Sequence, residues 1–137
     1  MWSWPVDGPR SIVRAFVAPA HRFGAGHRGI DVAAPEGAAV LAPAPGVVLF
    51  AGPVAGRSVV TVDHGGGVVS SYDPVAPSVT AGDAVTAGAR IGDLGPGAAM
   101  HCASGCLHVG VRRGGEYVDP VPYFHPPRRS ILLPLGP

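Results

Sequence analysis

The sequence has 137 residues, of which 47% are hydrophobic and 14% are charged, with 21 Gly and 16 Pro. This length fits one domain with a real core, and the apolar fraction argues against disorder. Gly and Pro are spread along the whole chain, which argues against a helical bundle. The net charge is +1 and no run of basic residues exceeds two, so neither a nucleic-acid interface nor an anionic membrane surface is predicted. No stretch approaches the roughly 20 apolar residues of a membrane span.

Short segments rich in Val and Ile, separated by Gly and Pro, predict β-strands along the chain. They cover residues 11–17, 29–33, 38–42, 46–52, 58–63, 68–72, 90–94, 106–112 and 116–118. The β-branched run around Val60 and the three glycines at 65–67 predict a hairpin. No segment has helical periodicity beyond about two turns. The sequence therefore predicts an all-β fold, a sandwich or a partly closed barrel.

Two segments share one order of short apolar pairs and turns that combine Gly with an acidic residue. They are residues 34–48 and 79–92, and the second resembles the turns of barrel-sandwich hybrid domains such as lipoyl and biotinyl domains. Those domains carry an exposed Lys, and this chain has none, so a carrier role is excluded while the architecture remains. We expect a single domain over 1–137, with a Pro-rich, extended tail at about 120–137 that packs back onto the sheet.

His27, Asp31 and His108 are the strongest candidates for a metal site. His27 and Asp31 form an H-x-x-x-D pattern flanked by Gly, and His108 lies in a predicted strand. Zinc binds imidazole nitrogen and carboxylate oxygen, and a catalytic zinc site commonly has three protein ligands and one open position. A surface His and a turn Asp would fit the same spacing. Because side chains alternate along a strand, Cys106 and His108 are expected on one face.

The order of these motifs resembles the lysostaphin/LytM-type zinc metallopeptidases, which cut peptide bonds in bacterial peptidoglycan. The resembling segments cover most of the chain: residues 4–6, 26–37, 45–48, 60–65, 79–92 and 107–120. The resemblance implies that His27, Asp31 and His108 hold one Zn²⁺ ion on the floor of a β-sheet groove. It also implies a metal-bound water as nucleophile and a peptidoglycan peptide laid across the sheet.

The chain departs from this family at both assisting histidines. The first His of the family's H-x-H motif is Cys106 here, and the Y-x-H motif reads Tyr72-Asp73-Pro74. Proton-transfer groups contribute about 10²–10⁴-fold and an oxyanion donor about 10²–10³-fold, so low activity is expected. His101 and Asp73 are the candidate catalytic replacements, although a loop His and a turn Asp without chemistry fit as well. The other histidines are assigned to structure or to the surface: His64, His21 and His125.

Cys102 and Cys106 are the two cysteines of the sequence, and they allow three interpretations. The favoured one is a small disulfide loop, which suits an oxidising exterior and would pin the loop that carries His101. Alternatively, a Cys106 thiolate is a fourth zinc ligand, which would close the site and leave no position for water. The third interpretation is a free buried Cys.

Two functions follow from these observations. The first is a monomeric, secreted zinc endopeptidase of peptidoglycan with weak or atypical activity. The second is a catalytically degenerate zinc-binding module that binds cell-wall peptide or regulates another cell-wall hydrolase. A phosphocarrier with a related hybrid fold needs two facing histidines and no metal carboxylate, so Asp31 argues against it. The resemblance and the cysteine pair imply the cell-wall side of the membrane, although residues 1–5 lack the pattern of a signal peptide.

Overall fold

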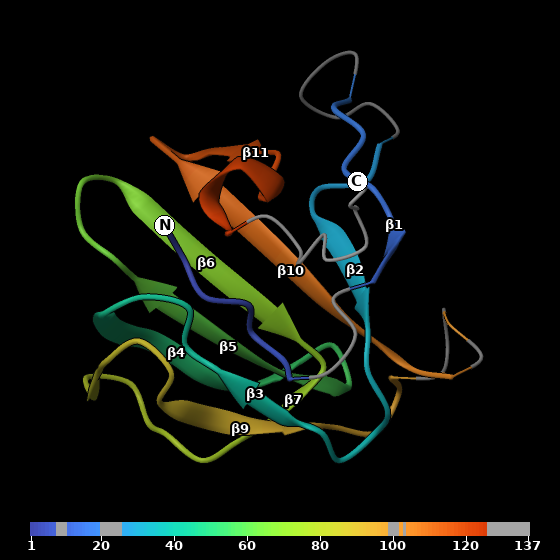
Figure 1. Ribbon diagram of the computed structural model, residues 1–137. Coiled ribbons are helices and arrows are strands. Elements are labelled where there is room, and N and C mark those ends of the chain that lie inside the picture. The colour runs from blue at the N-terminus through green and yellow to red at the C-terminus, as the bar shows by residue number, and fades with distance from the viewer. Residues whose placement is uncertain (8–10, 20–25, 99–101, 103, 126–137) are drawn as a thin grey trace, which may run out of the picture.

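Two antiparallel sheets make up the fold in the computed structural model, which describes residues 1–7, 11–19, 26–98, 102 and 104–125 (Figure 1). The larger sheet has eight strands in the order β1 (Ile12–Arg14), β2 (Ile30–Ala33), β10 (Cys106–Arg113), β6 (Val68–Asp73), β5 (Arg57–Asp63), β4 (Gly46–Val54) and β8 (Ala84–Val85), with β11 (Glu116–Val118) paired to β10. The smaller sheet has the order β3 (Ala39–Leu41), β9 (Arg90–Leu94) and β7 (Val75–Pro77). The described residues contain one 3-10 turn, at Val121–Tyr123, and no α-helix. The all-β prediction is confirmed.

Every strand predicted from the Val- and Ile-rich runs overlaps a strand of the structure. β4 extends past its predicted end to Val54, because Ala55 and Gly56 adopt positive φ angles of 50° and 89° and form a tight hairpin turn into β5. The strands β7 and β8 are absent from the prediction. They have three and two residues, too few to show a periodic pattern.

One apolar cluster joins the two sheets and fixes the orientation of every strand that carries a candidate residue. Leu107 and Val109 of β10 and Tyr72 of β6 are fully buried, and they pack in the same cluster as Val40 and Ile91 of the smaller sheet. Burying such side chains contributes about 1.5–3 kcal/mol each. Residues next to them in sequence must therefore face away from the core, because side chains alternate along a strand.

His64 takes part in a hydrogen-bond network with the buried residues Ser70 and Tyr72 of the large sheet. Its Nδ1 donates to the Pro45 carbonyl at 2.9 Å, and its Nε2 accepts from the Ser70 hydroxyl at 2.7 Å. The Tyr72 hydroxyl in turn donates to Ser70 Oγ at 2.7 Å. Desolvation by burial lowers the pKa of His64, which favours the neutral ring that these hydrogen bonds require. The structural role assigned to His64 agrees with these contacts.

The N-terminal segment packs against the first part of the predicted tail. Trp4 stacks on the buried Phe124 with ring centroids 4.9 Å apart, and its indole nitrogen donates to the His125 carbonyl at 2.7 Å. The first residues of the expected tail form the 3-10 turn, and Phe124 then lies in the core. The rest of that tail, 126–137, lies outside the described residues.

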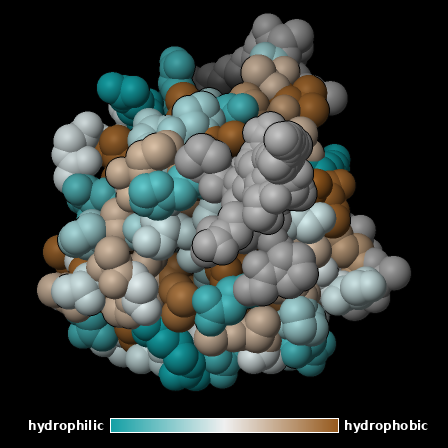
Figure 2. Space-filling view, in the orientation of Figure 1, coloured by the Kyte–Doolittle hydropathy of each residue, from teal (hydrophilic) through white to brown (hydrophobic). Residues whose placement is uncertain are grey.

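The surface of the described residues mixes polar and apolar side chains on the face that Figure 2 presents. Strand β4 exposes the largest group of apolar side chains: Val47, Leu49, Phe50 and Val54. Within the described parts of the chain, no helix has the length and hydropathy to cross a membrane.

Candidate metal centre

Three neighbouring strands of the large sheet set Asp31, His108 and Asp73 in one row. His108 of β10 pairs with Asp31 of β2 on one side and with Asp73 of β6 on the other. Directly opposed residues point to the same face of a sheet. Since the sequence neighbours Leu107 and Tyr72 are buried in the core, the row lies on the opposite, open face. Asp73 thus faces away from Tyr72, as strand alternation predicts.

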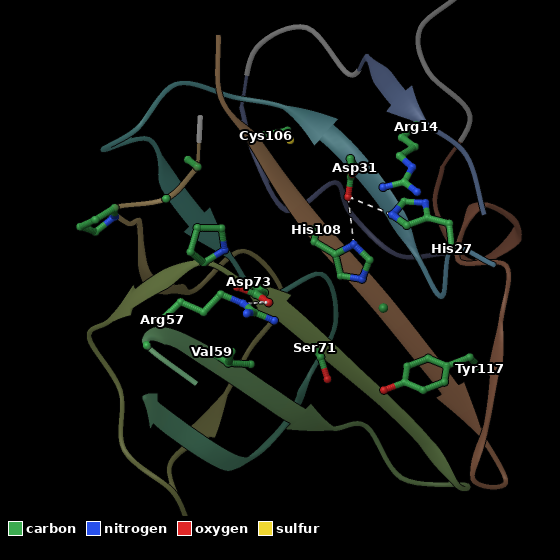
Figure 3. Close-up of a pocket in the computed structure, with 16 residues that line it drawn as sticks. Arg14, His27, Asp31, Arg57, Val59, Ser71, Asp73, Cys106, His108 and Tyr117 are labelled. Carbon is green, nitrogen blue, oxygen red and sulfur yellow. Dashed lines mark hydrogen bonds and ion pairs between the residues drawn. The ribbon is translucent and has the colours of Figure 1, made fainter. Parts of the chain in front are cut away.

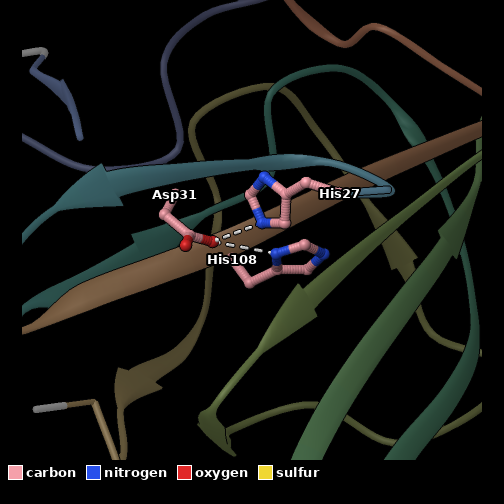
Figure 4. A group of neighbouring side chains, drawn as sticks. All are labelled: His27, Asp31 and His108. Atoms are coloured by element: carbon pink, nitrogen blue, oxygen red, sulfur yellow. Dashed lines mark hydrogen bonds and ion pairs between the residues drawn. The ribbon is translucent and has the colours of Figure 1, made fainter. Parts of the chain in front are cut away.

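His27 reaches the same place from the residues that precede β2. Its backbone pairs with Val17, with N–O distances of 2.9 Å in both directions. Its ring Nδ1 lies 2.8 Å from the carbonyl oxygen of Ala15. A carbonyl can only accept, so Nδ1 carries the proton and the lone pair of the neutral ring is on Nε2. Nε2 is directed at Asp31 and lies 3.3 Å from Oδ1 (Figure 4).

The three side chains form a compact donor set. Asp31 Oδ1 lies 2.9 Å from His108 Nδ1, and the possible ligand atoms of His27, Asp31 and His108 all lie within 4.8 Å of one another. His27 and Asp31 are buried, whereas the His108 side chain is 34% exposed, so the set opens to solvent on that side.

The charge state of Asp31 suits a cation. Burial raises the pKa of its carboxyl group, but the hydrogen bond from His108 and the positive charges of His27, His108 and Arg14 outweigh that effect, and the pKa lies below its ordinary value. In the neutral tautomer that the Ala15 contact requires, the lone pair on His27 Nε2 faces the Asp31 carboxylate, and a cation placed between them contacts both. Two nitrogens and one carboxylate oxygen fit zinc, and the hydrogen bond to Ala15 orients the His27 ring as partners of metal-bound histidines do.

Gly29 makes room for the His108 ring. A Cβ atom at this position would lie 2.3 Å from the Val109 carbonyl oxygen and 2.8 Å from His108 Nε2. We expect Gly29→Ala to displace His108 and to weaken zinc binding by about 10–100-fold, the range seen when ligand orientation is disturbed. Competition with a chromophoric chelator measures this affinity.

Gly52 provides the matched control for this variant, because it lies in the same sheet and its added Cβ would meet only Phe50 Cζ, at 3.7 Å. Gly52→Ala should bind zinc like the wild type, and thermal unfolding of both variants reports whether the sheet is intact. Wild-type zinc affinity in a folded Gly29→Ala protein would show that the position of His108 does not depend on Gly29.

A groove of about 900 Å³ runs over the open face and includes the metal candidates (Figure 3). Asp73 lies in it, and Arg57 Nε donates to Asp73 Oδ2 at 2.6 Å. The other oxygen, Oδ1, is buried and has no hydrogen-bond partner among the residues that the structure describes. The loop after β9 contributes Pro96, Gly97 and Ala98 to the wall. His101, further along this loop, lies outside the described residues and stays a prediction.

Cys102 and Cys106 form a disulfide, as the favoured interpretation predicts, with an S–S distance of 2.10 Å. The two alternatives, a Cys106 thiolate as fourth ligand and a free buried Cys, are therefore wrong for this structure. The disulfide borders the metal candidates, because both sulfurs lie within 4.8 Å of a carboxylate oxygen of Asp31.

Sequence reasoning missed Arg57, Arg14 and Tyr117, which also line the groove. Arg57 could have been found from the β5–β6 hairpin. The pairing of Val60 with Tyr72 brings the start of β5 beside the end of β6, where Asp73 lies. The strands of Arg14 and Tyr117 were predicted, but their three residues each do not show which side chains adjoin the groove.

Three candidate ligands that line a groove in an all-β domain match the arrangement expected of the zinc metallopeptidases that the motifs resemble. A sequence model of the family described as "Peptidase family M23" matches residues 25–120. The chain therefore belongs to peptidase family M23.

Relatives and solved structures agree with this assignment. The chain is 41% identical over 122 residues to the uncharacterized protein Rv2891 of Mycobacterium tuberculosis, in a match that covers 86% of this chain and 49% of that protein. It is 30% identical over 128 residues to the murein hydrolase activator NlpD of Salmonella typhimurium, covering 90% of this chain and 31% of that protein. A zinc-containing peptidase from Vibrio cholerae superposes with a TM-score of 0.68 at 25% identity, covering 86% of this chain and 38% of that one. The chain thus spans about half or less of the length of these proteins.

Proposed function

We propose that this domain is a zinc-dependent peptidase of weak or atypical activity that acts on peptidoglycan peptides on the cell-wall side of the membrane. The complete donor set of His27, Asp31 and His108, open to the groove at His108, carries the proposal. A zinc ion in such a set supplies Lewis acidity toward a carbonyl oxygen and lowers the pKa of a bound water.

We assign proton transfer to Asp73. Its position opposite His108 in the ladder sets it beside the metal candidates, and Arg57 fixes the carboxylate by binding Oδ2. We infer that this carboxylate, which lines the groove, accepts a proton from the attacking water and returns it to the leaving amine. His101 is the second candidate for this role. It follows the groove-lining loop residues in sequence.

The size of the groove supports the proposal that the substrate is a peptide. Its volume of about 900 Å³ is in the range of about 300–1,000 Å³ that ligand sites occupy. The name of one similar structure, a zinc-containing peptidase, favours a peptide substrate, and the name of NlpD, a murein hydrolase activator, favours the cell wall. The disulfide fits an oxidising location outside the cytoplasm.

The second candidate function is a catalytically degenerate module that holds cell-wall peptide or regulates another cell-wall hydrolase. Two observations favour it. The positions of both assisting histidines are occupied by Cys106, whose sulfur is in the disulfide, and by Pro74. The similarity to NlpD, an activator by name, points the same way. In this case the groove would bind peptide without turnover.

A zinc titration with a peptidoglycan assay tests both candidates. The oxidised protein is freed of metal, reloaded with increasing zinc, and assayed for new amino groups released from isolated peptidoglycan. We expect release that rises with zinc to one equivalent, is lost in His27→Ala, and persists in Asp93→Asn. Asp93 is the matched control because it is an exposed carboxylate of the smaller sheet, paired with Arg90.

The outcomes separate the two functions. Tight zinc binding with no release of amino groups would overturn the peptidase and leave the peptide-binding module. Absence of zinc binding by the wild type would overturn both metal-dependent functions.

A further inference from the structure

Asp31 belongs to two groups of possible metal ligands. One contains His27 and His108, and the other contains Cys102 and Cys106, whose sulfurs lie within 4.8 Å of its carboxylate and of each other. In the oxidised protein the two sulfurs are bonded together, and the thiolate, not the disulfide, is the form of Cys that binds metals. We propose that reduction of the Cys102–Cys106 bond creates a second, sulfur-containing ligand set at Asp31, which competes with His27 and His108 for the metal ion.

Backbone contacts, in addition to the S–S bond, hold the two cysteines beside Asp31. Cys106 pairs with Ala33 in the β10–β2 ladder, where His108 pairs with Asp31 two residues further along. The turn between the cysteines is closed by the hydrogen bond from Gly105 N to the Cys102 carbonyl, at 2.8 Å. Reduction of the disulfide breaks neither of these backbone contacts.

Gly105 is the residue that permits this close approach. Its φ angle is +93°, and a Cβ atom there would lie 2.4 Å from the carbonyl oxygen of Ala34. The carbonyl of Gly105 also accepts from Ala34 N at 3.2 Å, which ties the cysteine turn to the end of β2. The strand that carries Asp31 and the turn that carries the sulfurs are thus held together by the main chain.

The reductant that we infer is a dithiol, and of the two cysteines only Cys102 is accessible to it. Cys102 is partly exposed, whereas Cys106 is buried, so the first thiolate of the dithiol attacks the Cys102 sulfur and Cys106 leaves as a thiolate. The second thiol of the reductant then displaces Cys102 and closes its own disulfide. Two electrons pass to the protein, and any thiol proton is lost to solvent when the sulfur binds metal.

The consequence for activity follows from the position of the metal ion, and it rests on the proposed function. Both sets share Asp31, so a metal ion held by Asp31, Cys102 and Cys106 is withdrawn from His27 and His108. The oxidised domain would therefore be the active form, and the reduced domain a form that holds its metal away from the two histidines and does not turn over. A hydrolase with this property would be inactive in a reducing compartment and become active where disulfides form.

Cobalt(II) alone is the probe for the test, because a thiolate ligand gives it a near-ultraviolet charge-transfer band that imidazole and carboxylate do not. The wild type is compared in its oxidised form and after treatment with dithiothreitol, which is removed by anaerobic gel filtration before cobalt is added. We expect the band to appear in the reduced protein, and to be absent from the oxidised protein and from the Cys102→Ser/Cys106→Ser variant. A reduced wild type that binds cobalt without this band would overturn the proposal.

A second variant separates this proposal from the proposed function. Reduced His27→Ala should retain the sulfur band, since Asp31 and both cysteines remain, while oxidised His27→Ala should lose cobalt binding. Loss of the band from folded, reduced His27→Ala would contradict an independent set at Asp31. Failure of the peptidase proposal appears elsewhere, as absence of peptide release from the oxidised, zinc-loaded wild type, and leaves the cobalt spectra unchanged.

Discussion

Replacing Asp31 with Asn should weaken zinc binding by more than about 100-fold and abolish zinc-dependent peptide release. The substitution keeps the size of the side chain, so its effect is on charge and donor type. Loss of a hydrogen-bond partner of a ligand already costs about 10–100-fold in metal affinity, and Asp31 is itself the proposed oxygen ligand. It is also the carboxylate that both imidazoles face, at 3.3 Å and 2.9 Å.

Chelator competition measures the zinc affinity of Asp31→Asn, with Asp93→Asn as the control that removes an equal charge far from the groove. Far-UV circular dichroism of the metal-free proteins checks that both variants fold. If folded Asp31→Asn bound zinc like the wild type, Asp31 would not be a ligand, and the resemblance would have misassigned the site.

The architecture of this domain was accessible from local sequence patterns, because Val-rich runs and glycine turns determine each hairpin separately. Alternation along β10 also correctly predicted that Cys106 and His108 share a face, and alternation along β6 turned Asp73 away from Tyr72. These inferences need only the period of two residues in a strand.

Local sequence patterns could not predict which residues meet in the site. His108 and Asp31 are 77 residues apart and meet because β2 pairs with β10, a long-range contact with no local signal. Ligand chemistry grouped them as candidates, and the family resemblance assigned them to one site before the structure was known. The same pairing, Cys106 with Ala33, brings the disulfide beside Asp31. The spacing of the cysteines predicted their bond but not this neighbour.

The Asp73–Arg57 pair shows that a side-chain contact can escape prediction even within a single hairpin. Asp73 was a candidate from its place in the Y-x-H motif, but its orientation depends on Arg57, the first residue of β5. Arg57 is half-exposed and its guanidinium holds one carboxylate oxygen, while the other is buried and lacks a partner among the described residues. Leaving a buried carboxylate oxygen unpaired carries a free-energy cost, and a catalytic role is one explanation for such a group.

Asp73→Asn should therefore lower peptide release by about 10²–10⁴-fold, the contribution of a positioned proton-transfer group, while zinc affinity stays at the wild-type level. The amide preserves the shape of the side chain but cannot take the proton of the attacking water. Arg57→Ala should reduce release less, because it frees the carboxylate without removing it. Turnover on isolated peptidoglycan and chelator competition, measured on the same samples, separate loss of catalysis from loss of metal.

The comparison with His101→Ala decides which residue replaces the missing histidines. If Asp73 is the proton acceptor, His101→Ala retains most of the peptide release and Asp73→Asn does not. The reverse pattern would transfer this role to His101 and leave the Asp73–Arg57 pair as a structural contact of the groove wall. In both cases a replacement residue acts where the family uses histidine, because Cys106 is committed to the disulfide and Pro74 has no group that can move a proton.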